Sequence, residues 1–138
     1  MIIEISLQSK FSKVVATSKL VREYCSKKNI SRDECDEIEI CIVEALNNII
    51  EHSYGRIESH QIKIELNFEK MFLQIKITDR GKRRKIFVKR ELNANPSSIQ
   101  SLPERGMGLY IIEKLMNKVS YEFHNGSNAF TMIKYYDN

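Results

Sequence analysis

The sequence lacks any apolar run approaching the ~20 residues that a membrane-spanning helix requires, so a soluble chain is expected. Cysteine is also scarce: Cys25, Cys35 and Cys41 are odd in number and lack a paired C-x-x-C spacing. Neither a disulfide framework nor a zinc cluster is indicated, and buried thiols are expected. The sequence shows no internal repeat, and its small excess of 22 basic over 18 acidic residues does not imply nucleic-acid binding.

A chain of 138 residues with 42% hydrophobic and 29% charged residues is typical of a globular protein, and we expect a single domain over 1–138. The first ten residues, MIIEISLQSK, place a carboxylate inside an apolar run and have no basic leader. They are typical of a strand rather than of a signal peptide. A cytoplasmic location is therefore expected.

Alternation of apolar and polar residues predicts five strands, and helical spacing predicts three helices. The strands are expected at 2–7, 61–68, 72–78, 119–124 and 129–136, and the helices from a cap at Ser9 or Ser12 to 27–29, over 31–52 and over 106–119. Ser31 and Glu34 form a capping box, and Gly55 can end the second helix in the left-handed conformation. A hairpin turn is expected at 125–128, and a long loop follows Asp79.

This order of elements predicts an α+β fold, a two-layer sandwich in which a mostly antiparallel sheet carries three helices on one face. The other face of the sheet is expected to be less well covered by this chain. That face is a candidate surface for self-association or for a partner.

Glu44, Asn48 and His52 lie four residues apart in the second predicted helix. Side chains at this spacing stack over one another, so a carboxylate, an amide and an imidazole are predicted to share one stripe. The apolar residues of the same helix would pack against the sheet. A polar stripe beside such a surface needs water or a ligand.

Two glycine-containing segments lie at the ends of other predicted elements. Asp79-Arg80-Gly81 follows a strand, and Arg105-Gly106-Met107-Gly108-Leu109 opens the third helix. Taken singly, the first is usually a turn and the second often only relaxes the backbone. Together with the polar stripe, their order and spacing indicate one site.

These three segments resemble the motifs of the GHKL superfamily of ATPases, which share the Bergerat nucleotide-binding fold. The segment from Glu44 to His52 is similar to the N-box, E-A-x-x-N-x-x-x-H, and the two glycine segments resemble the first and second glycine boxes. Within the superfamily, the chain is most similar to the stand-alone anti-sigma factor serine/threonine kinases of bacterial partner-switching systems. The resemblance covers nearly the whole chain and implies a histidine kinase-like ATPase fold.

The resemblance implies ATP and Mg2+ as cofactors. Magnesium takes hard oxygen ligands and keeps several waters, so the amide oxygen of Asn48 together with nucleotide phosphates is a sufficient site. Glu44 is the expected general base for an attacking hydroxyl or water, with a cap or salt-bridge residue as the structural alternative. His52 is expected to shape the site rather than to do chemistry.

The resemblance assigns the nucleotide to the two glycine boxes. Asp79 would accept a hydrogen bond from the exocyclic amine of adenine, and Gly81 would let the backbone approach the ring. The second box would present helix N-terminal amides to the triphosphate. Its expected ATP-binding residues are Arg105, Gly106, Met107, Gly108 and Leu109, with a surface role as the alternative for the arginine.

One position departs from the family pattern. Arg83 stands where many relatives have a second glycine, within the basic run 82–85. Some stand-alone kinases also lack that glycine, so nucleotide binding is not excluded. The run either attracts the nucleotide or an acidic partner, or is a solvated face.

The resemblance implies a cytoplasmic protein kinase that binds a sigma factor and phosphorylates an anti-anti-sigma factor, its protein substrate. Phosphate on a partner adds charge that disfavours its complex. A homodimer is common in the resembled subfamily. The alternative is a non-catalytic nucleotide-binding switch, which Arg83 favours. Direct nucleic-acid binding through 82–90 is not expected, because Phe87 is the only stacking aromatic there.

Overall fold

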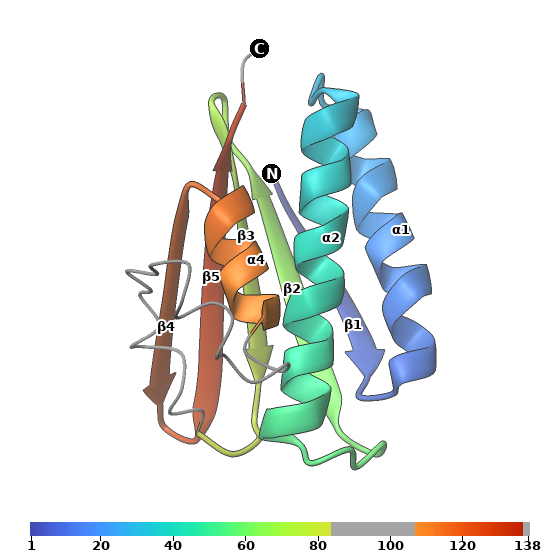
Figure 1. Cartoon of the computed structure of the whole chain (residues 1–138), viewed down its shortest axis with the longest axis vertical. Helices are drawn as coiled ribbons and strands as arrows, with labels where there is room; N and C mark the ends of the chain where they lie inside the picture. Colours follow the sequence, from blue (N-terminus) through green and yellow to red (C-terminus); the bar gives the residue numbers. More distant parts are fainter. Residues whose placement is uncertain (84–106, 137–138) are drawn as a thin grey trace.

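The computed structural model describes residues 1–83 and 107–136. One sheet has the strand order β1-β2-β3-β5-β4, and every neighbouring pair is antiparallel. The strands are β1 (Ile2–Gln8), β2 (Gln61–Phe68), β3 (Phe72–Asp79), β4 (Lys118–His124) and β5 (Ser127–Tyr135). The helices α1 (Val14–Ser26), α2 (Arg32–Asn48) and α4 (Met107–Leu115) cover one face of this sheet (Figure 1). The predicted two-layer α+β sandwich is confirmed.

The helix α2 begins with the predicted capping box. The Glu34 backbone N–H donates to Ser31 Oγ at 3.1 Å, and the Ser31 N–H donates to Glu34 Oε1 at 3.2 Å. Each side chain thereby satisfies a backbone donor that has no partner within the helix. The start of α2 is therefore fixed by two residues that are close in the sequence.

The helix α1 begins differently from the prediction. A 3-10 turn, η1 (Phe11–Lys13), precedes it, and its N-cap is Lys13, whose side chain makes no capping hydrogen bond. The predicted cap at Ser9 or Ser12 is therefore wrong. Ser9 is fully buried, and its hydroxyl donates to the backbone oxygen of Ile57 at 2.5 Å, which ties β1 to the segment before β2.

The predicted second helix extends past α2 as one wider, π-helical turn, η2 (Ile49–Ser53). The backbone N–H of Tyr54 donates to the oxygen of Ile49, five residues earlier, at 3.0 Å. Gly55 then takes the left-handed conformation expected of it, with φ 56°, and Arg56 continues it with φ 69°.

The bounds of α4, β4 and β5 differ from the predicted ones. The helix α4 ends at Leu115 rather than near 119, because β4 begins at Lys118 and pairs with β5. Asn125 and Gly126 alone form the turn between these strands, with φ 51° and 76°, as a two-residue type I′ hairpin requires. The predicted turn at 125–128 is too long, and Asn128 lies inside β5.

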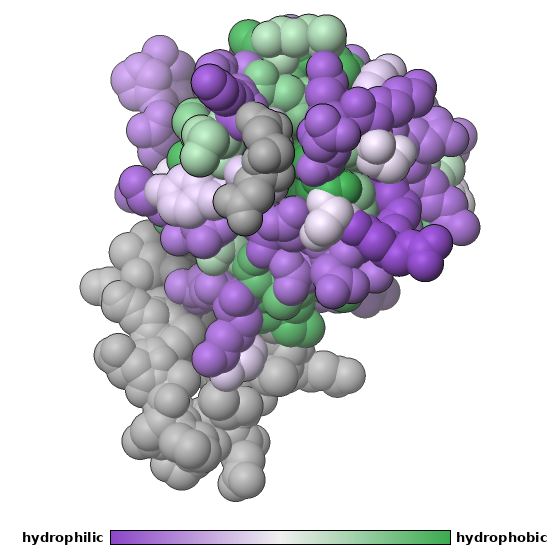
Figure 2. Space-filling view, turned by 90° about the horizontal axis from the view of Figure 1, so that it is seen from above, coloured by the Kyte–Doolittle hydropathy of each residue, from purple (hydrophilic) through white to green (hydrophobic). Residues whose placement is uncertain are grey.

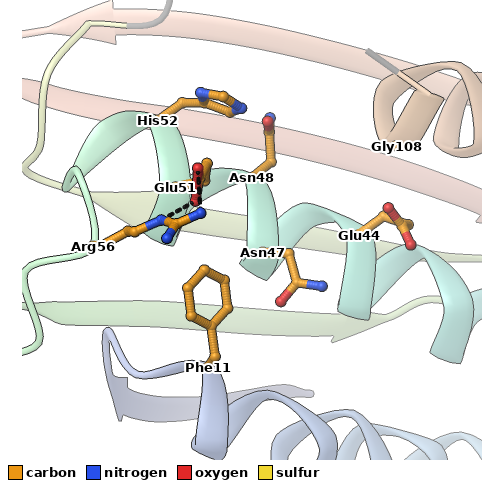
Figure 3. Close-up of a pocket in the computed structure, with 8 residues that line it drawn as sticks. All are labelled: Phe11, Glu44, Asn47, Asn48, Glu51, His52, Arg56 and Gly108. Carbon is orange, nitrogen blue, oxygen red and sulfur yellow. Dashed lines mark hydrogen bonds and ion pairs between the residues drawn. The ribbon is translucent and has the colours of Figure 1, made fainter. Parts of the chain in front are cut away.

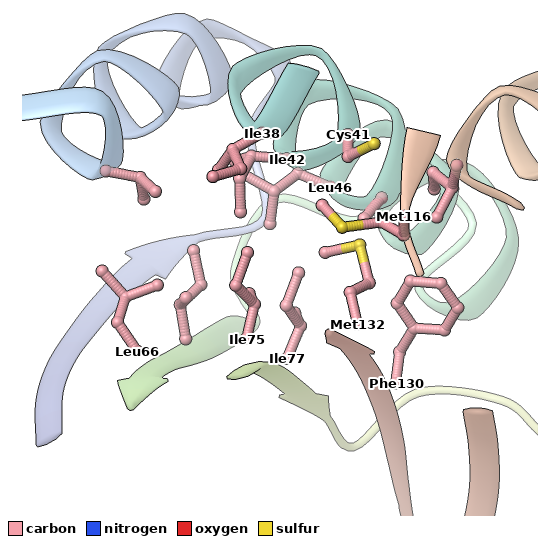
Figure 4. Close-up of a cluster of buried hydrophobic side chains, with 14 of the residues drawn as sticks. Ile38, Cys41, Ile42, Leu46, Leu66, Ile75, Ile77, Met116, Phe130 and Met132 are labelled. Atoms are coloured by element: carbon pink, nitrogen blue, oxygen red, sulfur yellow. The ribbon is translucent and has the colours of Figure 1, made fainter. Parts of the chain in front are cut away.

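The core lies between α2 and the sheet (Figure 4). Ile38, Ile42 and Leu46 of α2 and Ile75 and Ile77 of β3 are all 0% exposed. Burying each such side chain stabilises the fold by about 1.5–3 kcal/mol. Because these residues fix which side of α2 meets the sheet, they also fix which side carries the polar stripe.

The opposite face of the sheet carries polar side chains such as Lys63, Glu65, Gln74 and Lys76, which are half-buried or exposed. The surface seen from the end that carries the α1–α2 turn is also mainly hydrophilic (Figure 2). The open face of the sheet is therefore polar and faces solvent. Self-association through this face stays a prediction. Within the described ranges, no helix is both long and apolar enough to cross a membrane.

Candidate functional site

In the Glu44–Asn48–His52 stripe, the helix becomes wider at η2. The wider turn reduces the rotation of the His52 side chain away from the other two. In an α-helix, four residues make slightly more than one turn, so each successive member rotates away from the first. Asn48 is the last residue of α2, and His52 lies in η2, whose wider turn rotates each residue less. Figure 3 shows Asn48 and His52 pointing to the same side of the helix.

A pocket of about 320 Å³ contains this stripe (Figure 3). Its lining residues are Phe11, Glu44, Asn47, Asn48, Glu51, His52, Arg56 and Gly108. Of the predicted site residues, Glu44, Asn48, His52 and Gly108 therefore lie together, although Gly108 comes from a different helix.

Four lining residues were not predicted. Asn47 and Glu51 lie four apart, so the spacing argument that selected the stripe could have found them as well. Phe11 and Arg56 come from η1 and from the turn after η2. No local signal marks either of them, because the fold alone brings them to α2.

Gly108 sets the N-terminal turn of α4 directly against Glu44. A Cβ at Gly108 would lie 2.7 Å from Glu44 Oε1 and 3.7 Å from Glu44 Cβ. A side chain there would displace the carboxylate, so glycine keeps the space between the two helices open. The N-terminus of a helix also favours anions, which fits the phosphate contact predicted for this glycine.

Asp79 is the last residue of β3 and is 2% exposed. Its Oδ1 accepts hydrogen bonds from the backbone N–H of Gly81 at 2.9 Å and from Asn128 Nδ2 at 2.8 Å. A carboxylate accepts several hydrogen bonds, so these contacts fix its position and remain compatible with a contact to adenine.

Gly81 packs against the end of the predicted N-box helix. A Cβ at this position would lie 2.4 Å from the backbone oxygen of Ser53, closer than real atoms approach. The same oxygen accepts a hydrogen bond from the N–H of Lys82 at 2.8 Å. Glycine was predicted to let the backbone approach adenine. The close approach present in the structure is to Ser53, which joins the first glycine box to the residue after His52.

Asn128 is a site residue that the sequence reasoning missed. It is 0% exposed, and besides Asp79 its Nδ2 donates to the backbone oxygens of Gly81 at 3.2 Å and Lys82 at 3.0 Å, while its Oδ1 accepts from the Tyr121 hydroxyl. The sequence placed Asn128 in a turn. Its role depends on the pairing of β3 with β5, which puts it opposite Asp79.

Tyr54 contacts the first glycine box at its middle residue, Arg80. Its hydroxyl donates to the backbone oxygen of Gln61 and accepts from the N–H of Arg80, both at 2.8 Å. Burial raises the pKa of Tyr54, so the hydroxyl keeps the proton that it donates. The Tyr54 ring stacks on His60, with 4.4 Å between the ring centroids.

The donor set suits a magnesium–nucleotide complex rather than a metal held by protein alone. Among residues 1–83 and 107–136, no group of three or more His, Cys, Asp or Glu side chains could hold a metal ion. Asn48 is half-buried in the same pocket as Glu44. Magnesium bound to phosphates and waters needs only one or two protein ligands, so these residues fit the group.

The second glycine box is only partly described. Arg105 and Gly106 lie outside the described residues, and Met107 begins α4. Leu109 is 5% exposed and belongs to the core, so a ligand would reach this residue through its backbone. Gly108 is thus the one member of the box that the structure brings to the pocket among its described residues.

Arg83, which replaces the family glycine, contacts β4. Its guanidinium carbon lies 5.7 Å from the centroid of the Phe123 ring, a cation–π distance. Lys82 and Arg83 are exposed, and the other two residues of the basic run lie outside the described residues.

Known proteins share both the sequence pattern and the fold. Serine-protein kinase RsbW of Bacillus subtilis (strain 168) is 26% identical over 114 residues, which cover 80% of this chain and 70% of that relative. The crystal structure of the RsbU and RsbW domains of a Mycobacterium tuberculosis protein is similar with a TM-score of 0.69 at 15% identity. The match covers 97% of this chain and 32% of that longer one.

A second similar structure is that of the SiaB-SiaC complex from Pseudomonas aeruginosa. Its TM-score is 0.68 at 11% identity, and the match covers 95% of this chain and 88% of that one. At such identities the structural likenesses establish the fold alone. The family model described as the histidine kinase-like ATPase domain matches residues 7–134. The GHKL resemblance is thereby confirmed, and the chain belongs to the histidine kinase-like ATPase domain family.

Proposed function

We propose that the protein is an ATP- and magnesium-dependent protein serine/threonine kinase that also acts as an anti-sigma factor. The observation that supports this most strongly is the single pocket in which Glu44, Asn48 and His52 meet Gly108. The name serine-protein kinase of the RsbW relative supports the reaction class, and the SiaB-SiaC complex supports a protein partner.

Glu44 is the general base of the proposed reaction. It takes the proton of the acceptor hydroxyl while that oxygen bonds to the γ-phosphorus and the bond to the leaving ADP oxygen breaks. Asn48 would hold the magnesium ion, which would supply positive charge against the phosphates. His52 and the tip of α4 at Gly108 shape the pocket around these two side chains.

Asp79 selects adenine in this proposal, because a carboxylate accepts from the exocyclic amine of adenine, where guanine has a carbonyl. Asn128 and the N–H of Gly81 hold the carboxylate in place. The base would therefore bind at the end of β3, next to Ser53 and the end of η2.

The acceptor is an anti-anti-sigma protein, which competes with a sigma factor for this chain in the cytoplasm. A phosphate on the acceptor serine or threonine adds charge close to Glu44 and Glu51, and this disfavours the complex. The unphosphorylated acceptor binds this chain, which then releases the sigma factor. The phosphorylated acceptor dissociates from the chain, and the chain binds the sigma factor again.

The test combines phosphotransfer with ATP binding. Radiolabelled ATP and magnesium are incubated with the chain and with an anti-anti-sigma protein of the same organism, and ATP affinity is measured by calorimetry. Glu44→Gln should abolish labelling of the acceptor while ATP affinity stays within about threefold, because the base acts only in the transition state. Glu23→Gln, an exposed position on α1, is the matched control.

Each outcome of this test has a distinct meaning. ATP binding without labelling by the unchanged chain would indicate the non-catalytic switch. Full activity of Glu44→Gln would remove Glu44 from the role of base.

A further inference from the structure

Arg56 lines the same pocket as Glu44, but in a backbone conformation that arginine rarely adopts. Its φ of 69° lies in the left-handed region, directly after Gly55 at 56°. A side chain in this region is strained relative to glycine. Strained residues that persist beside a pocket commonly have a function there, so the guanidinium needs an explanation beyond the turn itself.

The ion pair between Arg56 and Glu51 adds too little to the stability of the fold to explain why an arginine occupies this position. Nε lies 2.7 Å from Glu51 Oε2 and Nη2 lies 3.0 Å from Oε1, while the Arg56 side chain is 70% exposed. Exposed ion pairs contribute little to stability. The two parallel contacts instead hold the planar guanidinium in one orientation. They use two of its five N–H groups, and no other acceptor is bonded to it within the described chain.

Arg56 belongs to the side of the pocket that faces α1. Figure 3 shows Asn48 and His52 pointing toward the side on which Gly108 lies, whereas Asn47 points toward Phe11. Phe11 is 44% exposed. Phe11, Asn47 and Arg56 form what we call the α1-side wall, and it lies across α2 from the side on which Gly108 lies.

The α1-side wall suits the acceptor rather than the nucleotide, an inference that rests on the proposed kinase function. In phosphoryl transfer the attacking and leaving oxygens lie roughly in line on opposite sides of phosphorus. With the triphosphate at the tip of α4, the acceptor hydroxyl therefore enters from the other side of α2. Phe11, Asn47 and Arg56 line the pocket on that side.

We propose that Arg56 is a positioning residue for the protein acceptor. Its oriented guanidinium donates to main-chain carbonyl oxygens of the serine-bearing segment, and Phe11 packs against that segment. A neutral carbonyl oxygen suits this place better than a carboxylate, because Glu51 already pairs with the guanidinium and Glu44 adds a further negative charge to the pocket. The segment recognised is therefore one without acidic side chains beside the acceptor hydroxyl.

Arg56→Gly provides the test, because glycine is the residue that the left-handed conformation favours. The variant removes the guanidinium, and the midpoint of denaturant unfolding should stay the same or rise. The KM for the anti-anti-sigma protein should increase about tenfold or more, the usual effect of losing a hydrogen bond from a charged group, while ATP affinity and acceptor-independent ATP hydrolysis stay within about twofold.

Arg56→Lys keeps the charge but not the forked donors and should show an intermediate KM. Arg32→Ala removes an exposed arginine at the other end of α2 and serves as the control.

The other outcomes overturn the proposal. A loss of ATP affinity as large as the rise in KM would assign Arg56 to the nucleotide, and an unchanged KM would leave it as a surface partner of Glu51. If the unchanged chain labels no acceptor, the proposed kinase function fails first, and that result is visible without any Arg56 variant.

Discussion

Asn128 Nδ2 donates a 2.8 Å hydrogen bond to Asp79 Oδ1 and so joins the last residue of β3 to the second residue of β5. The two residues are directly opposite in the antiparallel register, and both are almost fully buried. The carboxylate proposed to bind adenine is therefore held by the sheet itself.

Replacing Asn128 with alanine should affect stability and nucleotide binding together. The change removes a donor from the buried Asp79 carboxylate and from two backbone oxygens, and should lower the free energy of unfolding by about 1–3 kcal/mol. ATP affinity should fall as well, because the carboxylate loses its fixed position. Urea unfolding and calorimetry measure the two effects. Asn67→Ala, on the open face of β2, should change neither. Unchanged ATP affinity in a folded Asn128→Ala protein would show that Asp79 does not need this support.

Gly81→Ala and Gly108→Ala should fail in different ways. At Gly81 the new Cβ meets a backbone oxygen, that of Ser53, at 2.4 Å, so the main chain must shift and stability should fall by about 1–3 kcal/mol. At Gly108 it meets the end of the flexible Glu44 side chain at 2.7 Å. Gly108→Ala should therefore keep most of the stability but lower phosphotransfer, because the carboxylate is displaced. Equal losses of stability in the two variants would contradict this distinction.

Local signals were sufficient for the elements that are fixed by neighbours in the sequence. Alternation alone places β2 at Gln61–Phe68, and the Ser31–Glu34 pair correctly marks the start of α2. The errors occur where a distant partner decides. Serine is a residue type that commonly caps helices, but the Ser9 hydroxyl donates a hydrogen bond to the backbone oxygen of Ile57, 48 residues away. The helix α1 therefore begins without a cap from Ser9.

The same limit applies to the site. Helical spacing groups Glu44, Asn48 and His52, and the structure brings all three to one pocket. The wide turn η2 keeps His52 on the same side of the helix as Asn48. Asn128 could not be found in this way, since the sequence does not state that β5 lies beside β3. Arg56 could not be found either, because neither its left-handed backbone nor its contact with Glu51 follows from residue type.

The three cysteines should be unreactive in the folded protein. Burial raises the pKa of the thiols of Cys25 and Cys41 to about 12, and it also raises that of Cys35. Because the thiolate is the reactive form, iodoacetamide at pH 8 should modify none of them in the native state. All three should react in concentrated urea, which mass spectrometry would detect. Rapid labelling of the native protein at any one of them would mean that α1 or α2 opens locally.

The stability of the protein should fall less when the charge of Lys134 is removed than when its partner, Glu37, is removed. Its ammonium group is largely buried and donates to Glu37 Oε1 and to the backbone oxygen of Leu115, both at 2.6 Å, which ties β5 to α2 and to the end of α4. In Glu37→Ala the buried charge loses its counter-ion, and the free energy of unfolding should fall by about 1–3 kcal/mol, less than for a fully buried pair because Glu37 is 37% exposed.

Lys134→Met replaces the same side chain with an apolar one of similar length and leaves Glu37 able to reach water. Its cost should therefore be the smaller of the two, because no charge stays buried without a partner. Guanidinium unfolding of both variants measures the difference, with Glu23→Ala as a control for removing an exposed carboxylate. If Lys134→Met proved the more damaging change, the bond to the Leu115 carbonyl at the end of α4 would matter more than the charge pair, and the contact would act mainly to hold the helix that carries Gly108.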